Sequence, residues 1–151
     1  MNTMHLIIYT DGGARGNPGP AGSGVVIYRA EQQDNRTAGQ HRLELVEEFG
    51  KYLGVATNNQ AEYTAVLLAV KRAREIGATS IDFMMDSELA VRQLKREYKV
   101  RNAELAVLFT KIWNELIHFK KVTFTHIPRE KNKAADKMVN QAIDRGLQNS
   151  I

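Results

Sequence analysis

The sequence predicts an α/β fold in which helices flank a five-stranded mixed sheet. Three strand-like segments follow one another near the N-terminus with short links, which is typical of an antiparallel meander. A helical segment then leads into a fourth apolar strand, and such a crossover places the fourth strand parallel to the first. The length of 151 residues suits one domain with its own core.

The first strand is predicted at residues 6–10, a run apolar on both faces that fits the middle of a covered sheet. Asp11 follows at its carboxyl end, and ligands of open α/β sheets bind outside such ends. An Asp-Gly pair is also typical of a plain turn, so Asp11 by itself does not establish a site.

Residues 12–20 are rich in Gly and Pro, and we expect them to form a loop. The segment lacks the Gly-Lys-Ser/Thr of a P-loop and leads into a strand, which excludes both common kinds of nucleotide site. Its glycines either let a ligand approach the backbone closely or serve a plain hairpin connection. The sequence leaves both explanations open.

The second strand is predicted at residues 24–28. A polar insert at 31–39 is expected to be an exposed turn, and residues 41–53 contain a third strand. The charges of this third strand suit an edge or half-exposed position. These segments complete the predicted meander.

A helix is predicted from Ala61 to Ile76, where apolar residues recur at helical spacing until Gly77 ends the run. Asn59 and Glu62 have the spacing of a capping box, which would give Glu62 a role at the helix start. Because this helix must pack across the sheet, Glu62 could instead point toward the strand ends.

Residues 80–85 repeat the opening pattern, an apolar strand followed by an acid, Asp86. Ser87 is the predicted N-cap of a short helix at 88–96. Since this strand is expected to run parallel to the first, Asp11 and Asp86 should lie side by side. Adjacent carboxylates repel each other unless a cation lies between them.

A basic stretch at residues 92–101 is by default a solvated helix face and loop, and a groove for a phosphate backbone is the sharper alternative. A helix at 104–118 follows, with Trp113 expected in the core, and then a fifth strand at 121–127. These elements complete the predicted sheet and add helical cover to it.

Asn132 is the predicted N-cap of a last helix at residues 133–144. Asp136 lies one turn into this helix, where an acid suits the helix dipole. We expect residues 1–145 to form a single catalytic domain and residues 146–151 to form a short loose tail.

The sequence has no cysteine, which excludes disulfides, thiolate chemistry and cysteine-bound metals. A metal site would need oxygen and nitrogen ligands, which favour hard ions such as Mg²⁺ or Mn²⁺. The net charge of +4 is compatible with a polyanionic partner. No apolar run reaches membrane-spanning length and no secretory signal is present, so we expect a cytoplasmic protein with no membrane partner.

Four acids each have a local explanation, but all lie at strand ends or in first helical turns: Asp11, Glu62, Asp86 and Asp136. In a layered α/β fold they can converge on one edge of the sheet, where they would repel unless divalent cations are present. So many hard oxygen ligands suit two Mg²⁺ ions, an arrangement that activates water and stabilises the leaving oxygen in phosphodiester cleavage.

The chain resembles a type 1 ribonuclease H, in a form without the long basic protrusion of some bacterial members. The matching motifs occur in the family's order and cover nearly the whole chain. They are Tyr9-Thr10-Asp11-Gly12-Gly13, Gly16-Asn17-Pro18-Gly19, Thr57-Asn58-Asn59-Gln60-Ala61-Glu62, Asp86-Ser87, and His126 with Asn132 and Asp136.

The resemblance implies the ribonuclease H-like fold, with strands four and five parallel to strand one. It also implies cleavage of the RNA strand of RNA–DNA hybrids with two Mg²⁺ ions, or Mn²⁺ as a substitute, leaving 5′-phosphate and 3′-hydroxyl ends. Asp11 would bridge both metals, and Asp136 would help hold the ion that activates water. Glu62 and Asp86 would hold the ion at the leaving oxygen.

The resemblance also implies roles outside the carboxylates. His126 matches a mobile histidine thought to assist water entry or product release, although a histidine satisfied by its neighbours at a strand end is equally compatible. Thr57 and Asn102 match positions that bind a phosphate of the DNA strand. Contacts near the RNA strand, where the 2′-hydroxyl distinguishes RNA from DNA, are implied for Gly12, Gly13, Asn17, Asn58 and Asn59.

The chain departs from the family pattern in two places. Residues 87–104 leave no room for a protrusion, so substrate affinity would rest on the shorter segment 95–101 or be weaker. Glu88 stands where relatives often have Gln, which puts one RNA contact in doubt.

Two other classes of function fit the sequence less well. A non-catalytic nucleic-acid-binding module of this fold would be expected to have lost at least one of the four carboxylates. A transposase- or integrase-like enzyme usually needs further domains to hold DNA ends. We therefore favour the nuclease, and we expect a monomer without an obligate protein partner.

Overall fold

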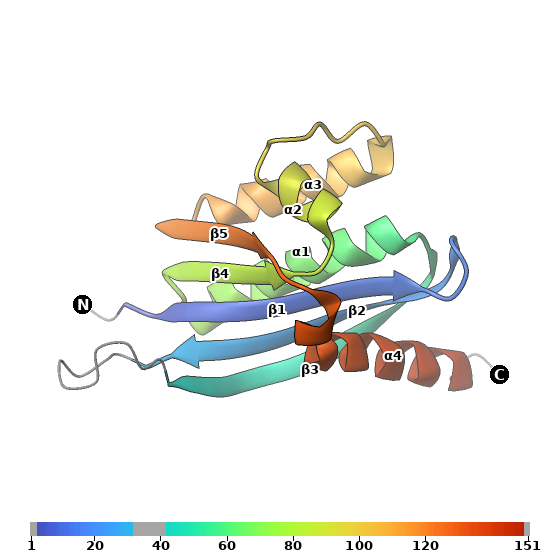
Figure 1. The fold of residues 1–151 in the computed structure, drawn as a ribbon, viewed down its shortest axis with the longest axis horizontal. Helices are drawn as coiled ribbons and strands as arrows, with labels where there is room; N and C mark the ends of the chain where they lie inside the picture. Colours follow the sequence, from blue (N-terminus) through green and yellow to red (C-terminus); the bar gives the residue numbers. More distant parts are fainter. Residues whose placement is uncertain (1–2, 32–41, 150–151) are drawn as a thin grey trace.

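The computed structural model describes residues 3–31 and 42–149. Its five strands form one sheet in the order β3-β2-β1-β4-β5 (Figure 1). Strands β1, β2 and β3 form the predicted antiparallel meander, and β4 and β5 run parallel to β1. The strands are β1 (His5–Ala14), β2 (Gly19–Ala30), β3 (Leu43–Ala56), β4 (Ser80–Met85) and β5 (Lys121–His126). The predicted fold class is confirmed.

Helices cover both faces of this sheet. They are α1 (Asn58–Ile76), α2 (Glu88–Leu94), α3 (Ala103–Leu116) and α4 (Lys133–Gln148). A Cβ atom built on Gly12 would meet α1 at Ala61, whereas one built on Gly13 would lie nearest Val139 of α4. Successive residues of a strand point to opposite faces, so α1 and α4 pack on opposite sides of β1, as Figure 1 shows. No helix within the described ranges is both long and apolar enough to cross a membrane.

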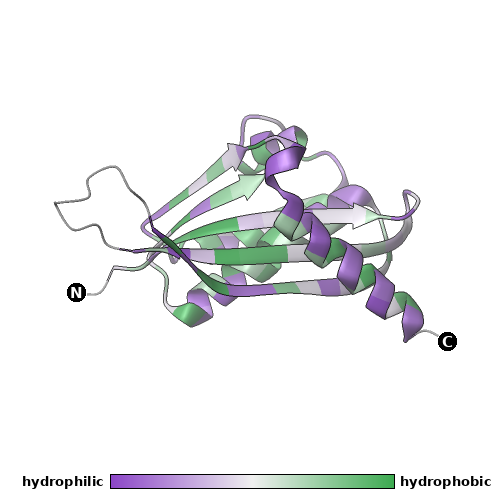
Figure 2. Cartoon of the chain, turned by 60° about the horizontal axis from the view of Figure 1, so that its bottom comes forward, coloured by the Kyte–Doolittle hydropathy of each residue, from purple (hydrophilic) through white to green (hydrophobic). Residues whose placement is uncertain are grey.

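The larger hydrophobic core lies between the sheet and α1, which α3 in turn covers. Leu6 and Ile8 of β1 and Val66 of α1 are fully buried in it. A smaller cluster joins Val26 of β2 to Ala135 and Met138 of α4 on the other face. Figure 2 shows α4 crossing this face with mainly hydrophilic residues on its outer side. Burial on both faces holds β1 and β2 as central strands.

The Gly- and Pro-rich segment 12–20 is mostly strand, which corrects the predicted loop. Strand β1 continues through Gly12 to Ala14, and β2 begins at Gly19, so only residues 15–18 form the connection. The antiparallel pairing continues past the acid, because Asp11 pairs with Gly24 and Ala14 with Ala21. The segment therefore forms a hairpin, and close approach of a ligand to its glycine backbone stays a prediction.

The last helix extends past Asp144, its predicted end, so the segment 146–149 is not a loose tail. Helix α4 continues to Gln148. A Cβ atom on Gly146 would lie 2.1 Å from Cγ of Tyr52. Because Gly146 has no side chain, the end of α4 fits against β3, and packing holds this turn of helix in place.

Other predicted boundaries shift by a few residues. Helix α2 ends at Leu94 rather than at residue 96, because Arg96 adopts a left-handed conformation with φ of 66°. Strand β3 begins at Leu43 on the sheet edge, as its charges suggested. Of the insert predicted at 31–39, all but Glu31 lies outside the described residues.

Candidate active site

Three of the predicted acids come together at the carboxyl ends of β1 and β4. One carboxylate oxygen each from Asp11, Glu62 and Asp86 lies within 4.8 Å of the others. Asp136, in the first turn of α4, is close enough to Asp11 to affect its ionisation by charge and by hydrogen bonding. All four acids line one open cavity of about 500 Å³. Residues up to 125 positions apart in the sequence thus share one site.

Sheet pairing places Asp11 beside Asp86. Thr10 and Met85 are the last pair of the parallel β1–β4 ladder, and the two acids follow them directly. Asp11 remains paired with β2, so its backbone is held by the sheet. The side-by-side arrangement expected from parallel strands is present.

Glu62 is not part of the helix cap, which corrects the predicted capping box. Thr57 is the N-cap of α1: its hydroxyl accepts a hydrogen bond from the Gln60 backbone N–H at 3.1 Å, and Gln60 Oε1 accepts one from the Thr57 N–H at 2.8 Å. Glu62 is buried, and its Oε2 has no hydrogen-bond partner among the described residues. The Thr57–Gln60 cap leaves Glu62 free to point to the strand ends.

Asn132 occupies the N-cap position of α4, but its side chain does not cap the helix. Its Nδ2 instead donates to the Thr10 carbonyl at 2.9 Å and to Asp86 Oδ2 at 2.8 Å. The predicted N-cap position is therefore confirmed, but the side chain does not serve as the cap. The amide links the last helix to β1 and fixes the orientation of Asp86.

The crowded carboxylates resist ionisation. Burial, followed by the charges of Asp86 and Asp136, raises the pKa of Asp11 to about 7. Burial also raises the pKa of Glu62 well above its ordinary range, and the charges of Asp11 and Asp86 add to the effect. Ionising these groups together requires a compensating cation. An all-carboxylate donor set that includes a buried oxygen without a partner in the described part of the chain fits a hard divalent ion such as Mg²⁺ or Mn²⁺.

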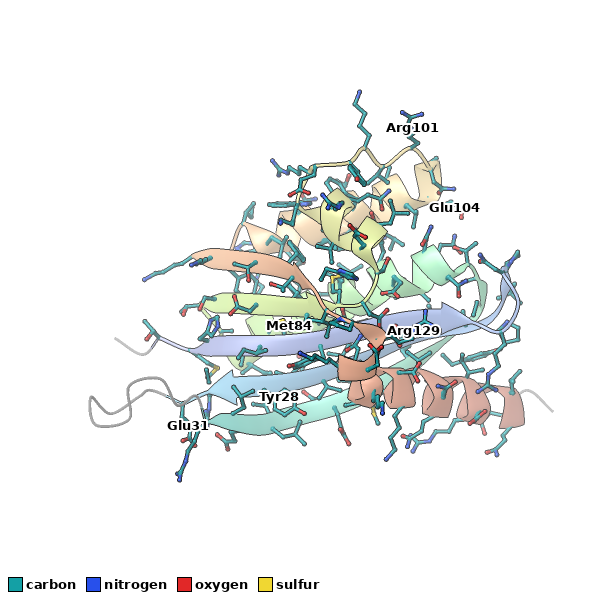
Figure 3. The ribbon with its side chains drawn as sticks, viewed as in Figure 1. Tyr28, Glu31, Met84, Arg101, Glu104 and Arg129 are labelled. Atoms are coloured by element: carbon teal, nitrogen blue, oxygen red, sulfur yellow. The ribbon has the colours of Figure 1, made fainter. Side chains whose placement is uncertain are left out.

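Two arginines line the acidic cavity, and the sequence reasoning singled out neither. Arg15 is already paired with Asp144 at 2.7 Å. Arg129 begins the 3₁₀ turn Arg129–Lys131 before α4 (Figure 3), and no ion pair engages it in the described part of the chain. The sequence signal was available, since Arg129 follows Pro128 where the strand pattern breaks between two site residues.

His126 is not brought to the four acids. It ends β5, is exposed, and lines a separate cavity of about 320 Å³ together with Glu88, Arg92 and Lys95. It is not among the residues that line the acidic cavity. Its predicted part in catalysis therefore has no support from a shared pocket.

The residues expected to contact substrate divide between two cavities. Gly12, Gly13, Asn58 and Asn59 line the acidic cavity. Asn17, Thr57, Asn59 and Asn102 line a neighbouring cavity of about 240 Å³, which we call the amide cavity.

Hydrogen bonds tie the β1–β2 hairpin to the start of α1 between these two cavities. Asn58 Oδ1 accepts from the Ala14 N–H at 2.8 Å, and Asn17 Oδ1 accepts from the Asn58 N–H at 3.0 Å. These bonds between backbone and side chains fix the hairpin against the start of α1, and so fix the residues that line the two cavities relative to one another.

Gly12 serves the packing of α1. A Cβ atom at this position would lie 2.2 Å from the carbonyl carbon of Ala61. The missing side chain lets the helix carrying Glu62 approach β1 closely, and so brings Glu62 to Asp11.

Much of the charge in the basic stretch is neutralised locally. Arg92 pairs with Glu88 and Glu97, each at 3.1 Å, and Lys95 pairs with Glu97 at 3.3 Å. The guanidinium of Arg96 stacks 3.9 Å from the ring centroid of Trp113, which is half-buried rather than fully in the core.

Besides Arg96, two cations of this stretch have no acidic partner within the described ranges, Lys99 and Arg101, and Arg101 projects outward in Figure 3. The connection from α2 to α3 spans only residues 95–102, so the protrusion is absent, as expected.

Known proteins match this chain over most of its length. The family model described as "Reverse transcriptase-like" matches residues 9–142. Ribonuclease HI of Halobacterium salinarum is 35% identical over 136 residues, which cover 90% of this chain and 63% of that protein. The crystal structure of LC11-RNase H1 in complex with RNA/DNA hybrid superposes with a TM-score of 0.80 at 43% identity, covering 94% of this chain and 99% of that one.

Some relatives are much longer than this chain. The bifunctional protein Rv2228c of Mycobacterium tuberculosis is 33% identical over 147 residues. The match covers 97% of this chain but only 38% of that protein.

Proposed function

Because the chain belongs to the type 1 ribonuclease H family, we propose that it is a metal-dependent endoribonuclease that hydrolyses the RNA strand of RNA–DNA hybrids. The observation that carries the proposal is the meeting of Asp11, Glu62 and Asp86 within 4.8 Å, with Asp136 beside them. A purely structural role does not explain why these acids lie together, because the charges of their neighbours raise the pKa of Asp11 and of Glu62 and so oppose their ionisation.

The four carboxylates would hold two Mg²⁺ ions, with Mn²⁺ as a substitute. Asp11, which lies between the other acids, would contact both ions, Asp136 would hold one of them, and Glu62 and Asp86 would hold the other. When bound, the ions supply a water nucleophile at neutral pH and stabilise charge on the leaving oxygen, which gives 5′-phosphate and 3′-hydroxyl products. Asn132 fixes the orientation of Asp86, and the β1–β2 ladder fixes the backbone of Asp11.

The cavity walls would bind the hybrid. The backbone at Gly12 and Gly13, with Asn58 and Asn59, would follow the RNA strand past the carboxylates, where the 2′-hydroxyl identifies RNA. Arg129 would meet an RNA phosphate at the rim of the acidic cavity, since it is the cation there without an acidic partner in the described part of the chain.

Thr57 and Asn102 would bind a phosphate of the DNA strand in the amide cavity, which Asn17 also lines. Lys99 and Arg101 of the α2–α3 connection have neither an acidic partner nor a stacking ring among the described residues, and would add non-specific attraction for the polyanion. The structure of a family member with RNA/DNA hybrid supports a hybrid as the ligand.

A non-catalytic nucleic-acid-binding module is the second candidate. The retention of all four acids together argues against it, as does the buried oxygen on Glu62 that has no partner among the described residues. A cytoplasmic location and a monomeric state remain predictions.

The proposal is tested with a labelled RNA–DNA hybrid and with matched duplex RNA and duplex DNA, with and without Mg²⁺. The native protein should cleave the RNA strand of the hybrid only with the metal, and Asp11→Asn should lose roughly 100-fold or more in rate. Glu75→Gln removes an exposed carboxylate at the far end of α1, outside the acidic cavity, and should keep native activity. Equal cleavage by Asp11→Asn, or equal cleavage of all three duplexes, would refute the assignment.

A further inference from the structure

The amide cavity presents hydrogen-bond donors from two helix starts. Thr57 caps α1 and Asn102 caps α3, and both side chains use their oxygen as the acceptor of the cap. Asn102 Oδ1 accepts from the Leu105 N–H at 3.1 Å, which leaves the Nδ2 group of Asn102 and the hydroxyl proton of Thr57 available to a ligand. Two capped helix starts that face one cavity favour an anion in it.

A carboxylate of the protein already lies in this cavity. Glu104, in the first turn of α3, lines the amide cavity and accepts a hydrogen bond from Gln60 Nε2 of α1. Figure 3 shows Glu104 at the start of α3. Glu104 therefore takes up a donor that faces the same cavity as the proposed phosphate-binding groups.

We propose that Glu104 is a built-in competitor of the DNA-strand phosphate, and so a determinant of substrate affinity. The inference rests on the proposed function, because it assumes that the amide cavity receives a phosphate. The negative charge of Glu104 repels that phosphate. The hydrogen bond to Glu104 also occupies the Nε2 group of Gln60, which would otherwise be available to the phosphate. Neutralising the charge should relieve the repulsion, and removing the whole side chain should also free the Gln60 donor.

A purely local role for Glu104 predicts a different outcome. An acid in the first turn of a helix is stabilising wherever it points, through the helix dipole. Such a role gives no reason for substrate affinity to change when Glu104 is neutralised. Measurements of hybrid binding, made together with measurements of thermal stability, therefore distinguish the two explanations.

The test compares Glu104→Gln with the native protein in equilibrium binding of the RNA–DNA hybrid in EDTA, where metal-dependent cleavage is blocked. Glu104→Gln should bind roughly three- to tenfold more tightly, and the gain should shrink as salt is raised. Glu104→Ala provides a second variant that cannot hold Gln60. Glu75→Gln, which removes one exposed charge at the far end of α1, should leave affinity unchanged.

Hybrids whose DNA strand carries one uncharged methylphosphonate linkage locate the effect. At a single linkage position the gain from Glu104→Gln should vanish, because the phosphate that Glu104 opposes is then neutral. If Glu104→Gln still binds more tightly at every linkage position, the effect is general electrostatic repulsion rather than opposition to one phosphate, and the proposal is overturned. Native-level affinity of both Glu104 variants, with native hybrid binding intact, would overturn it without touching the proposed function. Failure of the native protein to bind the hybrid would overturn both.

Discussion

Asn132 Nδ2 donates a hydrogen bond of 2.8 Å to Asp86 Oδ2, although the two residues are 46 positions apart. The same nitrogen donates to the Thr10 carbonyl at 2.9 Å, and Asn132 is only 1% exposed. One buried amide therefore connects the last helix, strand β1 and a carboxylate that follows β4. Its place in the fold makes it a positioning residue for Asp86.

Replacing Asn132 should weaken the metal site and the fold together. Asn132→Ala leaves the Thr10 carbonyl and Asp86 without their donor, so we expect a loss of about 1–3 kcal/mol in unfolding free energy. Metal affinity should fall roughly 10- to 100-fold, as for other residues that orient a ligand. Calorimetric Mg²⁺ titration and denaturant unfolding measure the two effects. Asn114→Ala, at an exposed position of α3, is the matched control, and unchanged metal affinity in folded Asn132→Ala would contradict the role.

Metal-free stability should fall as pH rises from about 4 to about 7. The pKa of Asp11 is 3.8 ordinarily and about 7 in the folded protein, so the folded state binds more protons than the unfolded state in this window. One such proton gives a slope of up to about 1.4 kcal/mol per pH unit, and the raised pKa of Glu62 acts in the same direction. Unfolding in EDTA across this range measures the slope.

Asp11→Asn and added Mg²⁺ should each flatten this dependence. The variant removes the titrating group, so at about pH 8 its metal-free stability should equal or exceed that of the native protein. Mg²⁺ replaces the bound protons, so its stabilising effect should grow with pH. A clear loss of melting temperature in metal-free Asp11→Asn at that pH would show that Asp11 has a structural role instead.

Gly12 and Gly13 should differ sharply in their tolerance of a side chain. A Cβ atom at Gly12 would lie 2.2 Å from backbone of α1, whereas at Gly13 the nearest atom of the opposite helix is 3.8 Å away. Gly12→Ala should therefore cost about 1–3 kcal/mol or more and displace Glu62, lowering metal affinity. Gly13→Ala should keep native stability. Equal melting temperatures of the two variants would contradict the close approach of α1.

Arg129 should matter more to cleavage than its neighbours. It lines the acidic cavity and has no acidic partner within the described ranges, so Arg129→Ala should reduce kcat/KM roughly tenfold and weaken the salt dependence of hybrid binding. Lys131→Ala removes an exposed cation of the same turn that does not line the cavity, and should have little effect. Equal losses in both variants would indicate general attraction of the polyanion rather than a specific contact.

Local sequence patterns were sufficient for the sheet and for the choice of the four acids. An apolar strand followed by an acid occurs twice, at Asp11 and Asp86, and the helical crossover between the strands implies that they are parallel. These inferences use periodicity and chain order, which are properties of contiguous residues. These inferences were wrong where strand pairing outweighed the local composition. Gly12, for example, lies within β1 although the composition of its segment predicts a loop.

The sequence by itself determined which helices and strands form and which acids lie at one edge of the sheet, because both follow from patterns over a few neighbouring residues. Only the tertiary structure decided how the acids are used. It assigned the cap of α1 to Thr57 rather than to Asn59 and Glu62, turned Asn132 toward Asp86, and kept His126 in a separate cavity. Hydrogen-bond partners and close approaches depend on distances between segments far apart along the chain, and those distances are set by packing.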